Sequence, residues 1–334
     1  MELWRESRRS KFRETQVSKF QGFKDKKASS KFRVSRQGSF GKEVSKFQGF
    51  KVSTPRSAKA KEMFRTRFKG EIVAEFLPPV VKVTRRGAGN RKESREQRYK
   101  QRHDRKQVII LCDGMPGIPR KQPLAEFLAG KGYWVFYPRY RGAWESDGEF
   151  LKQSPHQDIL DVIGELRKGV TEAAFGKKFR VMAEDIFVIG GSFGGAAAIL
   201  ASLDPRVKKV IANCPVVDWG ILKESEKAET SKPNYVEYLR EAFGNAYRLR
   251  KRNWAKLYAR KFYNPAHHAG EIDSSKIMMF HAKDDPHVPW SSVARFAKDT
   301  GAKLKLLQRG GHLRTEWVVQ RYWKEIEEFF ARSG

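Results

Sequence analysis

The chain has 334 residues, of which 40% are hydrophobic, and a formal net charge of +30 at pH 7. That length suits one large α/β domain with an extension, and no apolar run approaches the roughly 18 residues of a membrane span. Two cysteines exclude a disulfide framework, and no Cys/His cluster has the spacing of a zinc site.

The cysteines and the amino terminus indicate a reducing compartment. Cys112 and Cys214 lie in apolar runs, which is typical of buried free thiols. The charged residues 1–11 are followed by no apolar stretch, so no secretory signal is visible. We therefore expect a cytoplasmic protein.

The positive charge is concentrated in the amino-terminal third. Residues 1–106 carry a net charge of +21, and the remaining 228 residues carry +9. Within this third, Val-Ser-Lys-Phe-Gln-Gly-Phe-Lys occurs at residues 17–24 and again at residues 44–51. Two copies are too few for a solenoid, and the Ser/Lys/Arg/Gln-rich composition predicts a disordered extension over residues 1–62.

Three interpretations of this extension stay open. It is a basic arm that binds nucleic acid with phenylalanines stacking on bases, or a solvated tail without a specific partner. The third interpretation is translated repetitive DNA upstream of a true start at Met63. We favour the second and third interpretations over nucleic-acid binding, and the clean repeat supports the third.

From residue 63 the pattern is that of a folded domain, which we expect to span residues 63–334. Residues 71–77 alternate in polarity and end at two prolines, which predicts a strand, and residues 82–106 read as a basic surface excursion. Continuous apolar runs predict further strands at residues 108–112, 133–137, 185–189, 209–213, 277–281 and 304–307.

Helical patterns separate these strands. Ser154 is the expected N-cap of one helix, with Pro155 at its first position and Gln157 completing a capping box. Other helices are expected at residues 123–128, 193–203, 291–298 and 316–332. The alternation predicts a doubly wound, mostly parallel α/β sheet with sites at the carboxyl ends of its strands.

Residues 190–194 read Gly-Gly-Ser-Phe-Gly and match G-x-S-x-G between a strand and a small-residue helix. The motif puts Ser192 in a tight turn, where flanking glycines avoid Cβ clashes. The turn also directs the unpaired N–H groups of the helix amino terminus at developing negative charge. The alternative is a glycine-rich turn that only packs a helix on a strand, and the placement favours Ser192 as a nucleophile.

A serine nucleophile needs a histidine base and an orienting carboxylate, which in the α/β-hydrolase fold follow in the order acid, then His. After Ser192, one post-strand loop offers Asp284 and Asp285, and the next offers His312 behind two glycines. We expect Asp285 as the acid, with Asp284 as the alternative, and His312 as the base. We interpret the other histidines in this part as linker, packing or loop residues: His267, His268, His281 and His287.

The tetrahedral intermediate of acyl transfer needs two N–H donors at its oxyanion. The backbone of Phe193 is the first expected donor. The second should come from the loop after the 108–112 strand, where Met115 is expected, with an ordinary strand-to-helix turn as the alternative. This chemistry requires neither a metal nor an organic cofactor.

Together these residues resemble the catalytic domain of prolyl oligopeptidase-type serine peptidases over about residues 107–330. In chain order, the matching segments are Gly114–Gly117, Pro138–Gly142, Gly148–Phe150, Asp158, Asp161, Gly190–Gly195, Pro215–Trp219, Asp285–Pro289 and Gly311–His312. The resemblance implies an α/β-hydrolase fold and a serine-type peptidase that acts on small peptides.

Two departures from the family pattern bear on function. Family members often carry His-Gly-Gly-Pro or Tyr-x-Gly-Pro where residues 113–116 read Asp-Gly-Met-Pro, and an ionised Asp113 cannot donate to an oxyanion. The first 106 residues are too few for the β-propeller that gates substrate in many members. A carboxylesterase is therefore the runner-up, and a nucleic-acid-binding protein on an inactive hydrolase scaffold is a third hypothesis.

We expect residues 220–270 to form a helical lid between a strand and the acid loop. Its aromatic side chains should belong mainly to the core, with the rest lining a pocket: Tyr235, Tyr238, Phe243, Tyr247, Trp254, Tyr258 and Phe262. The basic residues 248–252 either form a solvated face, which is the favoured interpretation, or select an acidic substrate.

Overall fold

The computed structural model describes residues 63–80, 106–224, 234–259 and 261–332. The predictions for the extension at residues 1–62, and for nearly all of the basic excursion, lie outside these residues. Within the described part, no helix combines the length and the apolar character needed to cross a membrane.

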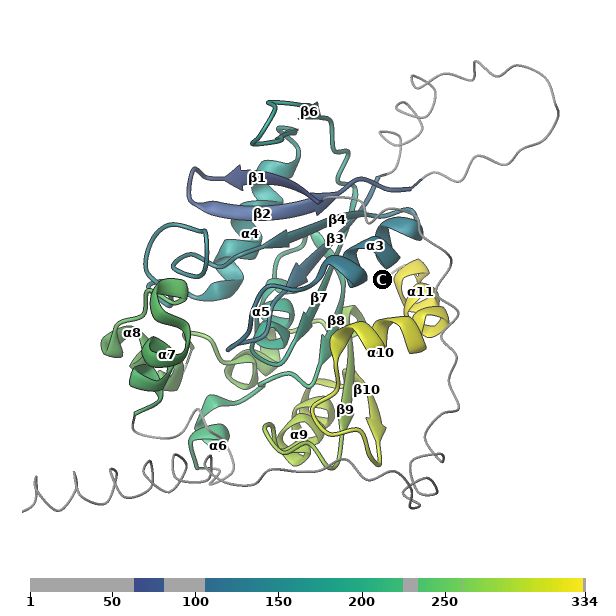
Figure 1. Ribbon diagram of the computed structural model, residues 1–334. Helices are drawn as coiled ribbons and strands as arrows, with labels where there is room; N and C mark the ends of the chain where they lie inside the picture. The colour runs from purple at the N-terminus through teal and green to yellow at the C-terminus, as the bar shows by residue number, and fades with distance from the viewer. Residues whose placement is uncertain (1–62, 81–105, 225–233, 260, 333–334) are drawn as a thin grey trace, which may run out of the picture. The chain divides into compact units, whose positions relative to one another are not determined.

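An eight-stranded sheet forms the centre of the domain, in the order β1-β2-β4-β3-β7-β8-β9-β10 (Figure 1). The strands are β1 (Phe64–Phe68), β2 (Ile72–Leu77), β3 (Gln107–Cys112), β4 (Trp134–Pro138), β7 (Asp185–Gly191), β8 (Val207–Asn213), β9 (Ile277–Ala282) and β10 (Lys303–Leu307). All neighbours from β4 to β10 are parallel, whereas β2 runs antiparallel to β1 and β4. The predicted doubly wound, mostly parallel sheet is confirmed. Its strand order reverses at β3, beside β7, and such switch points open a crevice at the carboxyl ends.

Alternate residues of each central strand face two helical layers, which explains the continuous apolar runs. In β3, Val108 and Ile110 pack in one core cluster, and Ile109 and Leu111 pack in the other. The first cluster includes α4 (Pro155–Leu166), α5 (Phe193–Ala201) and α9 (Trp290–Thr300). The second includes α3 (Gln122–Gly130), α10 (Thr315–Arg321) and α11 (Trp323–Ala331), which Figure 1 shows together on one side of the sheet.

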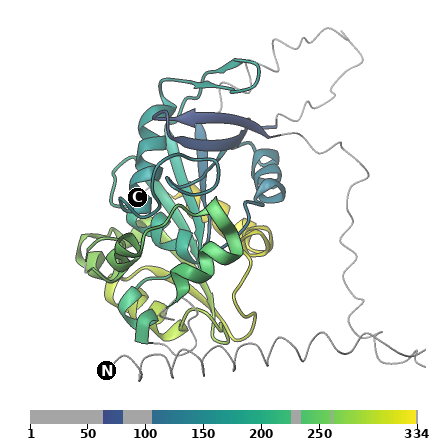
Figure 2. The same ribbon diagram turned by 60° about the vertical axis from the view of Figure 1, so that its left-hand side comes forward.

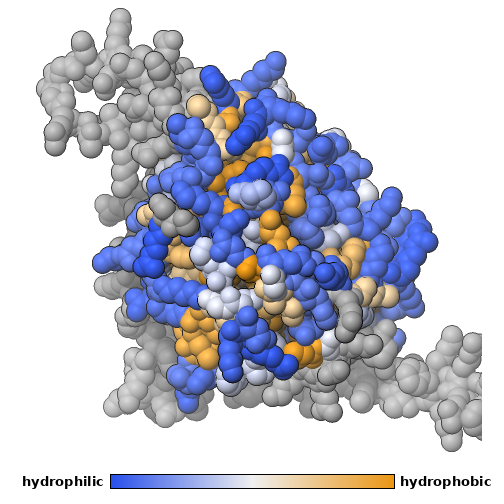
Figure 3. All heavy atoms as spheres, turned by 180° about the vertical axis from the view of Figure 1, so that it is seen from behind, coloured by the Kyte–Doolittle hydropathy of each residue, from blue (hydrophilic) through white to orange (hydrophobic). Residues whose placement is uncertain are grey.

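The outer surface carries most of the polar side chains. Viewed from behind, it is mainly hydrophilic, with apolar atoms gathered in the middle of that face (Figure 3). The two cysteines, Cys112 and Cys214, are buried and free, as predicted.

A helical insertion lies between β8 and β9, on the side of the domain where the parallel strands end (Figure 2). It contains α6 (Trp219–Glu224), α7 (Tyr235–Phe243) and α8 (Lys251–Ala255). A 3-10 turn at 244–246 lies between α7 and α8, and further 3-10 turns follow α8 at 256–258, 265–271 and 274–276. Tyr235, Tyr247 and Trp254 are buried, whereas Tyr238 is exposed. The aromatic side chains of this segment therefore belong mainly to the core. Residues 225–233 of the predicted lid lie outside the described part.

The structure differs from the sequence-based expectations in four local features. The sequence reading missed β1, because its exposed Arg65 and Arg67 hide the alternation of buried Thr66 and Phe68. It also missed the short hairpin of β5 (Val170–Thr171) and β6 (Lys178–Phe179).

The capping box before α4 does not form. Pro155 begins the helix as predicted, but the Ser154 hydroxyl bonds the ring of His156 at 2.7 Å instead of a helix N–H. The helix expected at residues 316–332 is broken into α10 and α11 at Tyr322. The ring of Tyr322 stacks on Phe280 of the sheet at 5.2 Å, so packing on the strand accompanies the break.

Candidate active site

Ser192 occupies the sharp turn between β7 and α5. Its backbone has φ +55° and ψ −120°, a conformation that costs a residue with a side chain about 1–3 kcal/mol. The neighbouring strand holds the turn, because the Ser192 N–H donates to the carbonyl of Asn213 at 2.8 Å. The hydroxyl is thereby presented at the carboxyl end of the sheet.

The glycines around Ser192 are required by close backbone approach. A Cβ on Gly190 would lie 2.1 Å from the carbonyl oxygen of Gly194. A Cβ on Gly194 would lie 2.4 Å from the carbonyl oxygen of Asp113 and 2.5 Å from that of Cys112. The turn therefore packs directly on the loop that follows β3.

Asp285 and His312 meet at the carboxyl ends of β9 and β10. The Asp285 Oδ2 atom lies 2.8 Å from Nδ1 of His312, and the carboxylate is fully buried. Its Oδ1 atom accepts the backbone N–H groups of His287 at 2.8 Å and Val288 at 3.1 Å. Burial alone would raise the pKa of this carboxyl, but His312 and the two N–H groups outweigh burial and lower it to about 2. Asp285 is therefore ionised at neutral pH.

The neighbouring Asp284 points elsewhere. Its exposed carboxylate accepts the backbone N–H groups of Gly310 at 3.2 Å and Gly311 at 2.8 Å, and these bonds lower its pKa. Asp284 thus supports the backbone of the loop that carries His312, while Asp285 contacts the ring.

The loop of residues 113–117 lies against Ser192. A Cβ on Gly114 would come within 3.6 Å of the Ser192 Cβ, so Met115 lies close to the turn. Asp113 carries no donor for an oxyanion, because its Oδ2 accepts the Tyr137 hydroxyl at 2.5 Å and its Oδ1 pairs with Lys121 at 3.2 Å.

A cavity of about 510 Å³ joins these elements. Ser192, Phe193, Met115 and His312 all line it, so the predicted nucleophile, base and oxyanion donors share one space, with Asp285 buried behind His312. The chain after β8 and the insertion contribute part of its apolar wall: Val216, Trp219, Leu222 and Tyr235.

The basic residues 248–252 do not line this cavity. Arg248 donates to the carbonyl oxygen of Trp144 at 3.0 Å, and Arg250 pairs with Glu149 at 2.5 Å. The cationic residues that do line the cavity are Arg120, Lys121 and Arg314. The hypothesis that residues 248–252 select an acidic substrate is therefore not supported by their position.

Comparison with known families assigns the chain. Residues 122–330 match the model of the prolyl oligopeptidase family. The chain belongs to the prolyl oligopeptidase family. It is thus a serine hydrolase, and the resemblance drawn from its motifs is confirmed.

Solved structures share the fold of this family member at low sequence identity. Est1E from Butyrivibrio proteoclasticus has a TM-score of 0.54 at 17% identity, covering 81% of this chain and 100% of its own. An esterase of Pyrococcus furiosus has a TM-score of 0.52 at 15% identity, covering 80% and 89%. The acylaminoacyl peptidase of Pyrococcus horikoshii has a TM-score of 0.51 at 19% identity, and this chain covers 42% of it. The α/β-hydrolase fold is confirmed, whereas a search of curated proteins found no sequence match.

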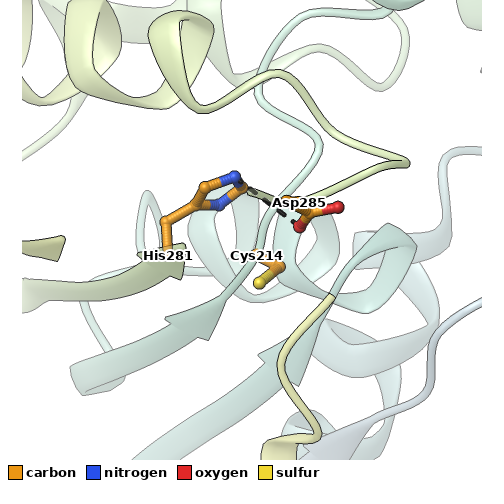
Figure 4. Close-up of side chains that lie close together, drawn as sticks. All are labelled: Cys214, His281 and Asp285. Carbon is orange, nitrogen blue, oxygen red and sulfur yellow. Dashed lines mark ion pairs between the residues drawn. The ribbon is translucent and has the colours of Figure 1, made fainter. Parts of the chain in front are cut away.

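Two residues that the sequence reading left outside the site lie beside the acid of this family member (Figure 4). The ring of His281, read from the sequence as a packed strand residue, lies 3.6 Å from Asp285 Oδ2, and the thiol of Cys214 also bonds Asp285. One potential ligand atom from each of the three lies within 4.8 Å of the others, but the Asp285 carboxylate is already engaged by His312. Their position directly at the ends of β8 and β9 is the sequence signal that could have found them.

Proposed function

We propose that this serine hydrolase cleaves small peptides by acyl transfer through Ser192, His312 and Asp285. The observation that carries the proposal is the 2.8 Å contact of Asp285 with His312, at a cavity that Ser192 also lines. A buried carboxylate on Nδ1 orients the imidazole and leaves Nε2 as the proton acceptor. The cavity volume of about 510 Å³ suits a short peptide.

In the first step, the Ser192 oxygen attacks the scissile carbonyl carbon while its proton passes to Nε2 of His312. The carbonyl oxygen becomes an oxyanion, for which the backbone N–H groups of Phe193 and Met115 are the proposed donors. The carbon–nitrogen bond then breaks as His312 returns the proton to the leaving amine. Water, deprotonated by His312, hydrolyses the acyl-enzyme and restores the Ser192 hydroxyl.

Packing supports the role of Phe193 as a donor. Its ring is buried among aromatic neighbours, with ring centroids 5.7 Å from Tyr140 and 4.8 Å from Tyr263. The Tyr263 hydroxyl also donates to the Phe193 carbonyl at 2.7 Å. Such preorganisation is what makes an N–H donor effective in the transition state.

A fluorophosphonate probe tests the nucleophile. We expect it to label the wild-type protein and Ser291→Ala, whose exposed serine on α9 lies away from the cavity, but not Ser192→Ala. Labelling of folded Ser192→Ala to the same extent would overturn the assignment of Ser192.

A carboxylic ester is the second candidate substrate class. The apolar wall of Val216, Trp219 and Leu222 suits an acyl chain as well as a side chain, and the similar solved structure from Pyrococcus furiosus is an esterase. The test compares one acyl-amino acid as its p-nitroanilide, as its p-nitrophenyl ester and within di- and tripeptides. Turnover of the amide and peptide bonds supports the peptidase, whereas turnover of the ester alone supports the esterase.

A further inference from the structure

A second histidine, His281, lies beside the acid and outside the cavity. Its side chain is fully buried at the end of β9 and lies beside Asp285 (Figure 4). His281 does not line the cavity, whereas His312 does. The His281 Nε2 atom lies 3.1 Å from the carbonyl oxygen of Val288 and 3.6 Å from Asp285 Oδ2. The oxygen that receives His312 therefore also faces His281.

These contacts determine which nitrogen of His281 carries the proton. A carbonyl oxygen can only accept, so Nε2 must be the protonated nitrogen and Nδ1 carries the lone pair. Nδ1 is buried and has no hydrogen-bond partner among the described residues. A second proton on Nδ1 would bury an unpaired donor, which is unfavourable. Burial accordingly lowers the pKa of His281 against the attraction of Asp285, and the ring stays neutral.

Three further groups face His281 and Asp285: His312, Cys214 and His287. Besides Asp285, His312 from the β10–α10 loop is the titratable group that acts on His281. Cys214, at the end of β8, contacts Asp285, and burial raises the pKa of its thiol far above the neutral range, so it remains protonated. The ring of His287, from the same loop as the acid, packs on His312 at 5.2 Å. The two buried neighbours of Asp285, His281 and Cys214, thus carry no charge at neutral pH.

We propose that His281 is a positioning residue that acts through Asp285: its neutral Nε2–H group donates to the carbonyl of Val288, the residue whose own N–H holds Asp285 Oδ1, and the positive end of the same N–H dipole faces Oδ2 at 3.6 Å. This inference rests on the proposed function. A neutral N–H group beside the carboxylate leaves the negative charge of Asp285 in place, whereas a lysine or arginine there would cancel it. The N–H dipole also offsets part of the negative charge of Asp285, so removing it should strengthen the attraction of Asp285 for a protonated His312.

The test compares two substitutions of His281. His281→Leu removes the donor, while His281→Gln keeps an amide N–H near the position of Nε2. For His281→Leu we expect the acid limb of the kcat/KM profile to move up by about half a pH unit, with KM unchanged. His281→Gln should restore the wild-type profile, and His267→Leu, at an exposed linker histidine, should match wild type. A folded His281→Leu enzyme with the wild-type acid limb would overturn the inference.

Nitrogen NMR of the wild-type protein gives a readout that needs neither turnover nor a variant. We expect His281 to carry its proton on Nε2 and to stay neutral throughout the titration of His312. A proton on Nδ1, or a cationic His281 near neutral pH, would overturn the inference. Failure of Ser192 to react with the fluorophosphonate would instead contradict the proposed function. The NMR measurement would still determine the tautomer and charge of His281.

Discussion

The carboxylates of Asp284 and Asp285 hold the His312 loop at two different points. The Asp285 carboxylate lies 2.8 Å from Nδ1 of the His312 ring. The Asp284 carboxylate accepts the backbone N–H groups of Gly310 and Gly311, which precede the histidine. Adjacent residues of one loop thus contact the ring and the backbone of another loop. Because only one of them touches the ring, their effects on activity should be separable.

Asp285→Asn should lower kcat about a thousandfold or more, because an amide at this position can hold the wrong tautomer of His312. Asp284→Asn should lower kcat by about tenfold at most, since it only weakens support of the loop backbone. Steady-state kinetics on a peptide substrate measures both values. Equal losses in the two variants would contradict the division between ring and backbone.

Asp285 should also make stability depend on pH in the acid range. Its pKa is about 2 in the folded protein and about 4 in an unfolded chain, so folding favours the ionised form. The stabilising contribution is complete above pH about 4 and is lost as the pH falls toward about 2.

Urea unfolding of the wild type and of Asp285→Asn measures this contribution. The difference in their free energies of unfolding should be constant at pH 5–7 and shrink between pH 4 and pH 3. A difference that stays constant over the acid range would show that folding does not favour the ionised form of Asp285.

Gly194→Ala should destabilise the protein by about 2 kcal/mol and reduce fluorophosphonate labelling. The added Cβ would lie 2.4 Å from the carbonyl oxygen of Asp113, so either the turn or the 113–117 loop must move. Gly270→Ala is the matched control, because nothing lies within 4 Å of a Cβ built there. The melting temperature and the labelling rate of Gly270→Ala should be close to those of the wild type. Similar losses of stability and labelling in both variants would contradict this explanation.

Tyr247→Phe should lower kcat several-fold and cost about 1–2 kcal/mol of stability. The Tyr247 hydroxyl accepts the N–H of Gly117 and donates to its carbonyl, both at 3.1 Å, and Gly117 ends the loop that carries Met115. Tyr238→Phe, at an exposed position of α7, is the control. Unchanged kcat in Tyr247→Phe would mean that the oxyanion loop holds its shape without this contact.

The elements that carry strong local signals were predictable from the sequence. The buried parallel strands read as continuous apolar runs, and Gly190–Gly194 could be recognised because backbone clashes restrict that turn to glycine. The exposed Arg65 and Arg67 concealed the alternation of β1, and the break at Tyr322 was concealed because it depends on packing against Phe280 of a distant strand.

Chain order and the placement of loops after strands were enough to predict the candidate site residues, but not which carboxylate contacts the His312 ring. Asp284 and Asp285 follow the same strand, so only the fold separates a carboxylate on the ring from one on the backbone. The role proposed for His281 was hidden for a similar reason. A buried histidine in an apolar strand looks like packing until the carboxylate beside it is seen.

The two hydrogen bonds between the Tyr247 hydroxyl and the backbone of Gly117 tie the insertion to the 113–117 loop. An insertion that swung outward at this point would strip both backbone groups of Gly117 of their partner and leave the oxyanion loop unsupported. Opening at this point would therefore also displace Met115, the proposed oxyanion donor. Tyr247 thus couples the position of the α7–α8 segment to the shape of the 113–117 loop.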